Sequence, residues 1–368
     1  MSRLDRYLLS QLLLLFGFFS LVLVGVYWVN RAVSLFDQLI GDGQSAVVFL
    51  EFTALSLPSV IRLVLPVSAF IAAIYVTNRL SAESELVVVL AAGLSPARLA
   101  RPVLVFGLCV AGMMLILTHI LVPVSRTELG LRSAEISQNI TSRFLVEGAF
   151  IHPAEGVTLY VRQITLQGEL LDVFLFDGRD RNQQTSYTAR RALLVKDRDG
   201  PKLIMFEGLA QTLQTAGNRL LTTTFKDLSY DIGSLVRVRS GVQRAGEMST
   251  LQLFRANPAD LASAGQSKAQ FLAEAHQRFV QPLLAIVAAV IGYSVLMLGA
   301  FSRLGKWRQI VLAVILLILM QLIGNQGLKL AQGDASLWLV AYAPVVFGAG
   351  AATLVLWAAG RNRRVASP

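Results

Sequence analysis

The chain has 368 residues, of which 54% are hydrophobic and only 15% are charged, and its mean hydropathy is +0.59. This composition is too apolar for a soluble protein of this length and indicates an integral membrane protein. The net charge of +10 requires no nucleic-acid partner, because basic residues at the ends of apolar segments serve to orient a membrane protein. The single cysteine, Cys109, excludes an intramolecular disulfide and a cysteine metal site.

Six segments of roughly 20 apolar residues predict six membrane-spanning helices. In chain order they are residues 7–30, 52–78, 102–125, 279–302, 309–328 and 335–360. The first is too long for the apolar part of a signal peptide, and no small-residue cleavage site follows it, so we expect it to remain as an anchor. The second contains one charged residue, Arg62, and charged groups inside spans are costly and usually functional.

A short polar interruption, "NRLSAESELVVVLAAGLSPARLARP", separates the second and third spans and predicts a helix over residues 80–93. Ser81 is expected to cap its start, and Glu83 and Glu85 would lie in its first turn, where carboxylates suit the helix dipole. Gly93 is expected to end this helix, and the Ser-Pro pair at 95–96 predicts the start of the next one.

Basic residues cluster on one side of the predicted spans, whereas the opposite short loops, such as "DQLIGDGQSAVVFLE", are acidic or neutral. The four basic clusters are Arg3 and Arg6; Arg79, Arg98 and Arg101; Arg303, Lys306 and Arg308; and Arg361, Arg363 and Arg364. The positive-inside rule therefore places both termini and residues 78–102 in the cytoplasm. Residues 126–268 are expected on the far side of the membrane.

The long segment 126–268 differs in character from the spans. "GVTLYVRQI", "LLDVFLFDG", "ALLVKDRDGPKLIMFEG" and "RLLTTTFKDLSYDI" alternate apolar and polar residues with period two, and "RDGP" predicts a hairpin turn. Short strands at this spacing indicate an all-β insert, either a sandwich, a jelly roll or an open barrel.

No catalytic motif accompanies these elements. His119, His152 and His276 lie far apart in the sequence, and a lone histidine is more often structural than catalytic. "LGKW" at 304–307 lacks the hydroxyl residue and the preceding glycine of a phosphate-binding loop. The chain is therefore expected to be no enzyme, and its energy would come from a gradient or from a partner.

The 80–93 helix leaves two interpretations open. Its acidic start and its apolar "LVVVLAAG" suit docking into a groove of a partner protein. Alternatively, the helix is a solvated elbow whose apolar residues, Leu86, Val87, Val89 and Leu90, pack on the spans of the chain itself.

The run "LPVSAFIAAIYVTNRLSAESELVVVLAAGLSPARL" resembles the second span and coupling helix of the lipopolysaccharide-export permease family, LptF and LptG. "ESELVVVLAAGLS" is the most specific part of this resemblance, and the doublet Glu83 and Glu85, "LDVFLFD" and "GDASLWLVAYAPVV" are closer to LptF. The resemblance implies spans 1–3 in residues 1–125, a periplasmic β-jelly-roll domain in 126–268 and spans 4–6 with a basic cytoplasmic tail in 269–368.

The same resemblance implies a permease subunit of an ABC transporter in the cell inner membrane. Such a subunit pairs with an LptG-like paralogue, and two copies of an LptB-like ATPase bind the coupling helices. The chain itself would bind no cofactor, because ATP and Mg²⁺ would bind to the ATPase. Lipopolysaccharide would pass through the jelly rolls to an LptC-like protein and a periplasmic bridge.

In this family the glutamate of the "SEL" motif contacts the ATPase, and the matching residue here is Glu85. A carboxylate on a rigid helix can transmit ATPase closure through charge-assisted hydrogen bonds. We expect Leu86, Val89 and Leu90 to fill the groove of the ATPase, because they recur at helical spacing, and Glu83 to contribute less.

Lipopolysaccharide carries phosphates above its acyl chains, so its binding site should combine apolar walls with cations. Guanidinium groups suit phosphate through paired donors. Arg62, Arg31, Arg126 and Arg132 are the candidates; for Arg62 the alternative is a structural partner such as Asp37, and the other three could merely extend their charged ends to the membrane surface.

Two other classes of function compete with the permease. A gradient-driven secondary transporter would show acidic residues or broken helices near the membrane midplane, and no predicted span has Asp or Glu in its central part. A membrane adaptor or signalling protein would keep the coupling helix but would need no cationic lipid site.

Overall fold

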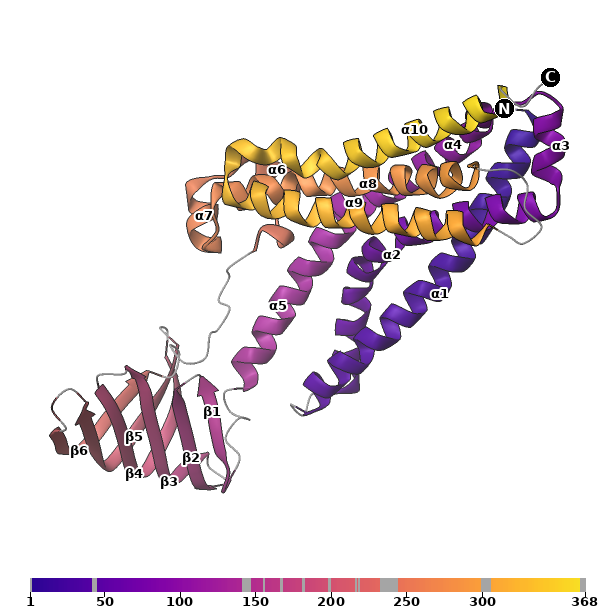
Figure 1. Cartoon of the computed structure of the whole chain (residues 1–368). Helices are drawn as coiled ribbons and strands as arrows, with labels where there is room; N and C mark the ends of the chain where they lie inside the picture. The colour runs from indigo at the N-terminus through magenta and orange to yellow at the C-terminus, as the bar shows by residue number, and fades with distance from the viewer. Residues whose placement is uncertain are drawn as a thin grey trace. The chain divides into compact units, whose positions relative to one another are not determined.

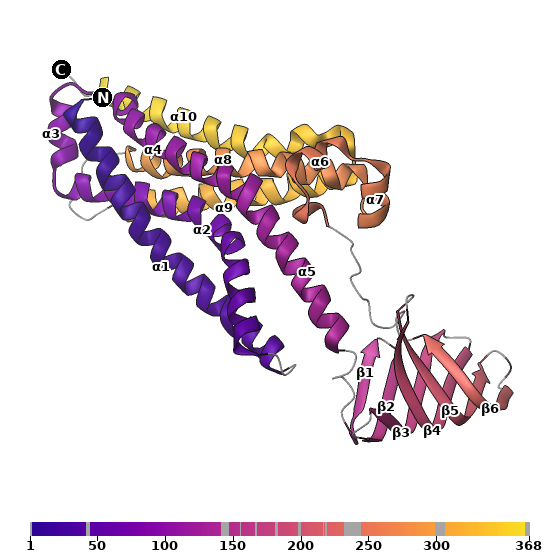
Figure 2. The same ribbon diagram turned by 180° about the vertical axis from the view of Figure 1, so that it is seen from behind.

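The computed structural model describes residues 2–41, 45–140, 147–154, 156–165, 168–180, 183–197, 200–215, 217, 219–231, 244–298 and 306–364 (Figures 1 and 2). They form two compact units, a helical unit of Met1–Leu129 with Val242–Pro368 and a β unit of Gly130–Gly241. The β unit is therefore shorter than the domain expected over 126–268. Residues 244–268, which were expected in that domain, form short helices and belong to the helical unit.

The first half of the chain is almost entirely helical. Its elements are α1 (Arg3–Gly41), α2 (Ala46–Ala82), α3 (Glu85–Ala91), α4 (Pro96–Ile116), the π-helical turn η1 (Leu117–Leu121) and α5 (Val122–Ile140). After the β unit come η2 (Ala245–Glu247), α6 (Thr250–Arg255), α7 (Pro258–Ala264), α8 (Lys268–Leu296), α9 (Trp307–Gly333), η3 (Ala335–Tyr342) and α10 (Ala343–Arg364).

Six helical stretches in the described part of the chain are long and apolar enough to cross a membrane, which confirms the six predicted spans. They are Arg3–Phe36, Ala46–Ala82, Pro96–Ser133, Lys268–Leu296, Trp307–Gly333 and Ala335–Arg361. Of 18 consecutive residues in the apolar part of α8, 72% are buried, whereas the corresponding share in α1 is 11%. The helix α8 is therefore the centre of the bundle, whereas α1 presents most of its surface outward.

Small residues let other helices approach α8 closely. A Cβ added to Gly107 of α4 would lie 3.0 Å from Ile286 Cα, and one added to Gly292 of α8 would lie 3.0 Å from the carbonyl oxygen of Phe70 in α2. Ala285, Ala288 and Ala289 on α8 are fully buried. Close backbone approach through small residues is how helices associate where lipid provides no hydrophobic driving force.

The insert is all-β, as predicted, and its described strands form one antiparallel sheet in the order β1 to β6. The strands are β1 (Phe150–Ala154), β2 (Val157–Ile164), β3 (Glu169–Asp180), β4 (Gln183–Asp197), β5 (Gly200–Gln214) and β6 (Arg219–Asp231). The expected hairpin at "RDGP" is present, because Asp197 of β4 pairs with Gly200 of β5.

This sheet folds over along a crease that crosses its strands. On β2 and β4 the inward–outward alternation breaks, and two consecutive residues are exposed at 162–163 and 190–191. In the same row, Asp172 of β3 and Glu207 of β5 have left-handed backbone with φ of 50° and 49°. Bends of this kind let strands pass from one layer into another. The two-layered form of the insert thus arises from folding a single meandering sheet around one apolar core.

Charges of alternating sign follow the outer side of the crease. Arg162 pairs with Asp172 at 3.2 Å, and Arg190 pairs with Glu207 at 3.5 Å. All four side chains are at least half exposed, so each pair contributes at most about 1 kcal/mol to stability. These charged residues therefore lie along the crease but contribute little to the stability of the sheet.

A polar contact fastens the two layers inside the fold. Tyr230, near the end of β6, donates a hydrogen bond of 2.7 Å to Asp177 Oδ2 on β3, and Arg179 also donates to this oxygen at 2.7 Å. The hydrogen bonds from Arg179, and secondarily from Tyr230, lower the pKa of the Asp177 carboxyl from 3.8 to about 2 although burial opposes the shift. The folded state therefore favours the ionised carboxylate.

We expect Asp177→Asn to destabilise the β unit by about 2 kcal/mol at pH 7, because the lowered pKa is a stability contribution of that order. The contribution is complete above the ordinary carboxyl pKa of 3.8. It is lost as the pH falls through the folded pKa of about 2. Hydrogen exchange of β3 and β6 peptides in the full chain, between pH 7 and pH 2, measures the difference. Asp227→Asn, at an exposed position on β6, is the control, and a pH-independent difference for Asp177→Asn would contradict the assignment.

Candidate functional site

The helix α3 lies between α2 and α4, at the end of the helical unit that also carries the N-terminus and the last turns of α10 (Figure 1). It comprises Glu85–Ala91, shorter than the 80–93 expected. The predicted start at Ser81 is wrong, because α2 continues to Ala82 and Glu83 caps its end while pairing with Arg79 at 2.9 Å. Only Glu85 of the two glutamates lies in the first turn of α3.

The turn before α3 and the turn after it have different causes. Ser84 has left-handed backbone, with φ of 61°, and its side chain makes no capping bond. Gly93, with φ of 87°, ends the elbow as predicted, because glycine adopts this conformation without steric cost. Ser95 accepts a hydrogen bond from the Arg98 backbone N–H, and Pro96 is the first residue of α4, both as predicted.

The apolar residues of α3 divide between two faces. Leu86 is only 8% exposed and belongs to the core of the bundle, against which Val89 and Leu90 also pack. These three residues therefore pack on the spans of the chain itself, as the second interpretation of this helix expected for them, and their contact with a partner's groove stays a prediction. The outward apolar surface consists of Val87 and Val88, which are 43% and 67% exposed.

Glu85 lies on the edge between these faces. Its carboxylate accepts a long hydrogen bond of 3.4 Å from Tyr7 Oη in α1, and the residue is partly buried. Its position in the first turn of α3 suits a carboxylate, because the backbone N–H groups there carry partial positive charge. Glu85, Val87 and Val88 together form an acidic and apolar outward surface, which we call the α3 surface.

A second group of charged residues lies inside the helical unit. Arg62 of α2 is half buried and interacts electrostatically with Arg126 of α5 and with Glu274 and Arg278 of α8. Glu274 is paired with Arg278, at 3.8 Å. Within the described residues, neither Arg62 nor Arg126 has a side-chain hydrogen bond or an ion pair. The structure thus brings together two of the four predicted arginines, in a group where three guanidiniums face one carboxylate, Glu274.

Arg278 is a member of this group that sequence reasoning missed, since it was placed just before the fourth span. It is only 2% exposed. Its guanidinium donates to Thr250 Oγ1 at 3.0 Å and to the carbonyls of Met248 at 2.8 Å and Ala245 at 3.3 Å. These bonds satisfy Arg278, which therefore fixes the η2–α6 segment on α8.

Two prolines explain the backbone geometry around this group. Pro282 lacks an N–H, so the Arg278 carbonyl loses its helical partner and accepts a 3.2 Å bond from Thr118 Oγ1 of η1 instead. Pro123 interrupts the helix in the same way just after η1, where the Val122 N–H bonds to Leu117, five residues back. A proline four residues after an arginine in an apolar run was the sequence signal for this contact.

The other two predicted arginines lie elsewhere. Arg31 is exposed on α1 and is not among the charges that act on Arg62. Arg132 is exposed on α5, in the part of that helix that belongs to the β unit. Arg31 is therefore not part of the group around Arg62 and Arg126.

Two of the histidines expected to be isolated are joined by aromatic rings. His119 contacts Phe279, with ring centroids 4.7 Å apart, and Phe279 contacts Phe254 at 6.2 Å. Phe254 contacts His276 at 5.3 Å, and His276 stacks on Trp338 at 4.5 Å. This chain of rings links α6, α8 and η3 near the α6–α7 end of the helical unit (Figure 2). No group of three metal-binding side chains occurs among the residues that the structure describes.

Six apolar helical stretches and an all-β insert define a multi-pass membrane protein. The chain belongs to the lipopolysaccharide export system permease family LptF/LptG, whose model matches residues 6–358. It is 23% identical over 302 residues to the uncharacterized protein RP871 of Rickettsia prowazekii, covering 81% of this chain and 82% of that protein. It is 25% identical over 235 residues to the lipopolysaccharide export system permease protein LptF of Escherichia coli K12, and this match covers 61% of each chain. Members of the family are permease subunits and not themselves catalytic.

Proposed function

We propose that this chain is the LptF-like permease subunit of an ABC transporter that extracts lipopolysaccharide from the inner membrane. The observation that carries the proposal is the Arg62–Arg126 pair, two neighbouring guanidiniums that form no ion pair among the described residues, in a unit built of apolar spans. Lipopolysaccharide combines phosphates with acyl chains, so it can satisfy both the cations and the apolar walls. The LptF choice is supported by the names of the Escherichia coli and Shigella flexneri relatives.

The energy for extraction comes, in this proposal, from a separate LptB-like ATPase dimer that binds ATP and Mg²⁺. The sequence holds no phosphate-binding loop of its own. The α3 surface is the docking place, because it combines exposed apolar side chains with a carboxylate on a short helix between two spans. The chain itself binds no cofactor.

The remaining partners follow from the same function. An LptG-like paralogue pairs with the helical unit, and the β unit passes lipopolysaccharide to an LptC-like protein and the periplasmic bridge. The β unit has an apolar core of its own, which supports its role as a separate domain in this transfer. Both termini and α3 are cytoplasmic in this arrangement, and the β unit is periplasmic.

Gentle solubilisation followed by reconstitution tests the whole proposal. We expect the chain to retain a six-span paralogue and a Walker-containing ATPase, and the complex in lipopolysaccharide-loaded proteoliposomes to release lipid only with ATP. An adaptor would retain the ATPase but release no lipid. A secondary transporter would release lipid with a proton gradient and without ATPase. Either of these results would refute the permease assignment.

We expect the α3 surface and the β unit to lie on opposite sides of the membrane, because the basic clusters alternate along the chain. Val88→Cys on α3 and Ser229→Cys on β6 place single thiols at exposed positions in a chain whose Cys109 is replaced by alanine. An impermeant maleimide applied to intact spheroplasts should label only the Ser229→Cys variant, and permeabilisation should make both reactive. Equal labelling before permeabilisation would contradict the proposed orientation.

A further inference from the structure

A part-buried ion pair joins the first turn of α1 to the first turn of α4. Asp5 is 5% exposed, and its two carboxylate oxygens accept hydrogen bonds from the two terminal nitrogens of Arg98, each at 2.9 Å. The Ser2 N–H adds a third bond to Asp5, at 3.0 Å. A paired guanidinium–carboxylate contact fixes orientation as well as distance. The two helices are therefore held as one body at this end.

The fastened turns lie on both sides of α3 in the chain. Tyr7, two residues after Asp5, reaches Glu85 at the start of α3, with 3.4 Å between the hydroxyl and carboxylate oxygens. Arg98 follows the end of α3 by one short turn, and the Ser95 side chain caps its backbone N–H. The beginning of α1 thus contacts the chain just where α3 begins and just after it ends.

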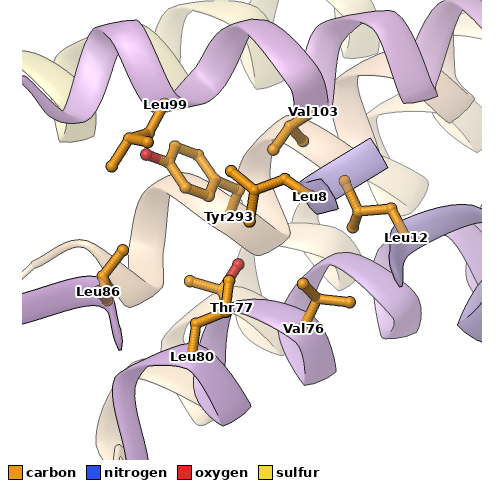
Figure 3. A pocket seen from close by; sticks show the side chains of 9 residues that line it. All are labelled: Leu8, Leu12, Val76, Thr77, Leu80, Leu86, Leu99, Val103 and Tyr293. Atoms are coloured by element: carbon orange, nitrogen blue, oxygen red, sulfur yellow. The ribbon is translucent and has the colours of Figure 1, made fainter. Parts of the chain in front are cut away.

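A third contact extends this connection to the central helix. Tyr293 of α8 donates a hydrogen bond of 2.8 Å to the Pro96 carbonyl, the first residue of α4. Its ring also borders a cavity of about 20 Å³ directly behind α3. Figure 3 shows the side chains around this cavity, with Leu86 on one side and residues of α1, α2, α4 and α8 on the others.

The cavity leaves Leu86 little room to move, whereas the polar contacts of Asp5, Arg98 and Tyr293 join the surrounding helices directly. Protein interiors are close-packed, and a void of this size holds one water molecule at most. Its lining is apolar except for Thr77, whose hydroxyl already donates to the Ala73 carbonyl at 2.7 Å, and Tyr293. A displaced α3 can therefore move Leu86 only slightly before it presses on the helices around the cavity, and the Asp5–Arg98 pair resists separation of α1 from α4.

We propose that the Asp5–Arg98 ion pair is a positioning element for transport, which makes α1 and α4 follow α3 when a docked ATPase displaces it. The inference rests on the proposed function, since it assumes that α3 is the docking place. Asp5 and Arg98 do not touch the ATPase or the lipid in this role. They set how much lipid is moved for each ATP hydrolysed.

The test compares Asp5→Asn, Arg98→Gln and the double variant Asp5→Asn/Arg98→Gln in the reconstituted complex. The double variant leaves no unpaired buried charge, which makes it the one best suited to fold and assemble. We expect it to retain the ATPase and its hydrolysis rate but to release at least about fivefold less lipopolysaccharide per ATP, the usual lower size of coupling between sites. Arg98→Lys, which keeps the charge without the paired contact, should lie between it and the unchanged chain.

Arg79→Gln is the matched control. It removes an ion pair of the same elbow that joins residues of a single helix, with both side chains nearly half exposed, so lipid released per ATP should not change. An unchanged ratio in the double variant overturns the proposal, and so does loss of the ATPase from it, which would make the pair merely structural. If the unaltered complex releases no lipid with ATP, the proposed function itself fails, whatever the variants do.

Discussion

Replacing Glu85 by arginine is expected to abolish lipopolysaccharide release and to strip the ATPase from the permease during purification. The carboxylate of this partly buried residue lies in the first turn of α3, on the edge of the outward apolar surface of that helix. Loss of a charged contact at an interface costs about 2–5 kcal/mol when its partner is left buried and unpaired. An arginine adds repulsion if that partner is a cation, and it also places positive charge at a helix N-terminus, where it is unfavourable.

The measurement is the amount of ATPase retained per permease, together with lipid released in proteoliposomes. Glu83→Arg is the matched control, because it makes the same change two residues away, at the end of α2, where the carboxylate is engaged by Arg79. We expect it to weaken the elbow without removing the ATPase. Full ATPase retention and full release in the Glu85→Arg variant would show that this residue does not couple the two proteins.

The spans could be predicted from the sequence because lipid imposes a simple requirement, about 20 apolar residues in a row. The boundaries of α3 could not. Ser81 has the right chemistry for a cap, but it is buried with Leu80 against the bundle, and the Arg79–Glu83 pair carries α2 past it. Tertiary packing therefore determines where α2 ends. Ser84 then adopts the left-handed backbone conformation in which glycine or asparagine is more usual.

The face that α3 turns to the bundle was equally inaccessible to periodicity. "ELVVVLA" has no polar side, so spacing identifies a stripe at Leu86, Val89 and Leu90 without telling whether it faces the protein or a partner. In the structure, the stripe of Leu86, Val89 and Leu90 packs against the helices of the bundle. The outward residues Val87 and Val88 then follow from helix geometry, since they lie on the opposite side of a seven-residue helix.

Two further features were not predicted from the sequence: the crease of the sheet and the short helices after the β unit. Asp172 and Glu207 adopt left-handed backbone, which cannot be read from the sequence because non-glycine residues rarely do so. It accompanies the bend of the whole sheet. The helices α6 and α8, in contrast, carried readable signals. "STLQ" at Ser249 and "SKAQ" at Ser267 are capping boxes, which mark helix starts. The prediction of an all-β segment up to residue 268 did not take these two motifs into account.

Only part of the cationic site could be predicted from the sequence, because its residues are brought together by packing. A lone arginine in an apolar span identifies Arg62 from the sequence alone. Its neighbour Arg126 lies 64 residues further on and comes to it only because η1, which directly precedes α5, packs on α2. Arg31 shares the residue type and the span-end position but is not among the charges that act on Arg62.

We expect Arg62→Glu to reduce photo-crosslinking of lipopolysaccharide and its ATP-driven release by at least about tenfold, the effect of losing roughly 1.4 kcal/mol of binding. Reversing the charge would place a carboxylate beside Arg126, so the two residues would neutralise each other and no longer attract phosphate. The same pairing preserves the fold, because the new carboxylate finds a cation in place. Assembly and basal ATP hydrolysis should therefore stay near those of the unaltered complex.

Two further variants separate lipid binding from structure. Arg62→Lys keeps the positive charge but not the paired donors, so it should lose less than Arg62→Glu. Arg31→Glu makes the same reversal at an exposed position outside the cluster, and it should leave crosslinking unchanged. If Arg62→Glu assembled poorly while its surviving complexes crosslinked lipid normally, Arg62 would be a structural residue. In that case Arg126, with no other cation of the pair to assist it, would be too weak a site to hold a phosphate, and the lipid would have to be recognised elsewhere.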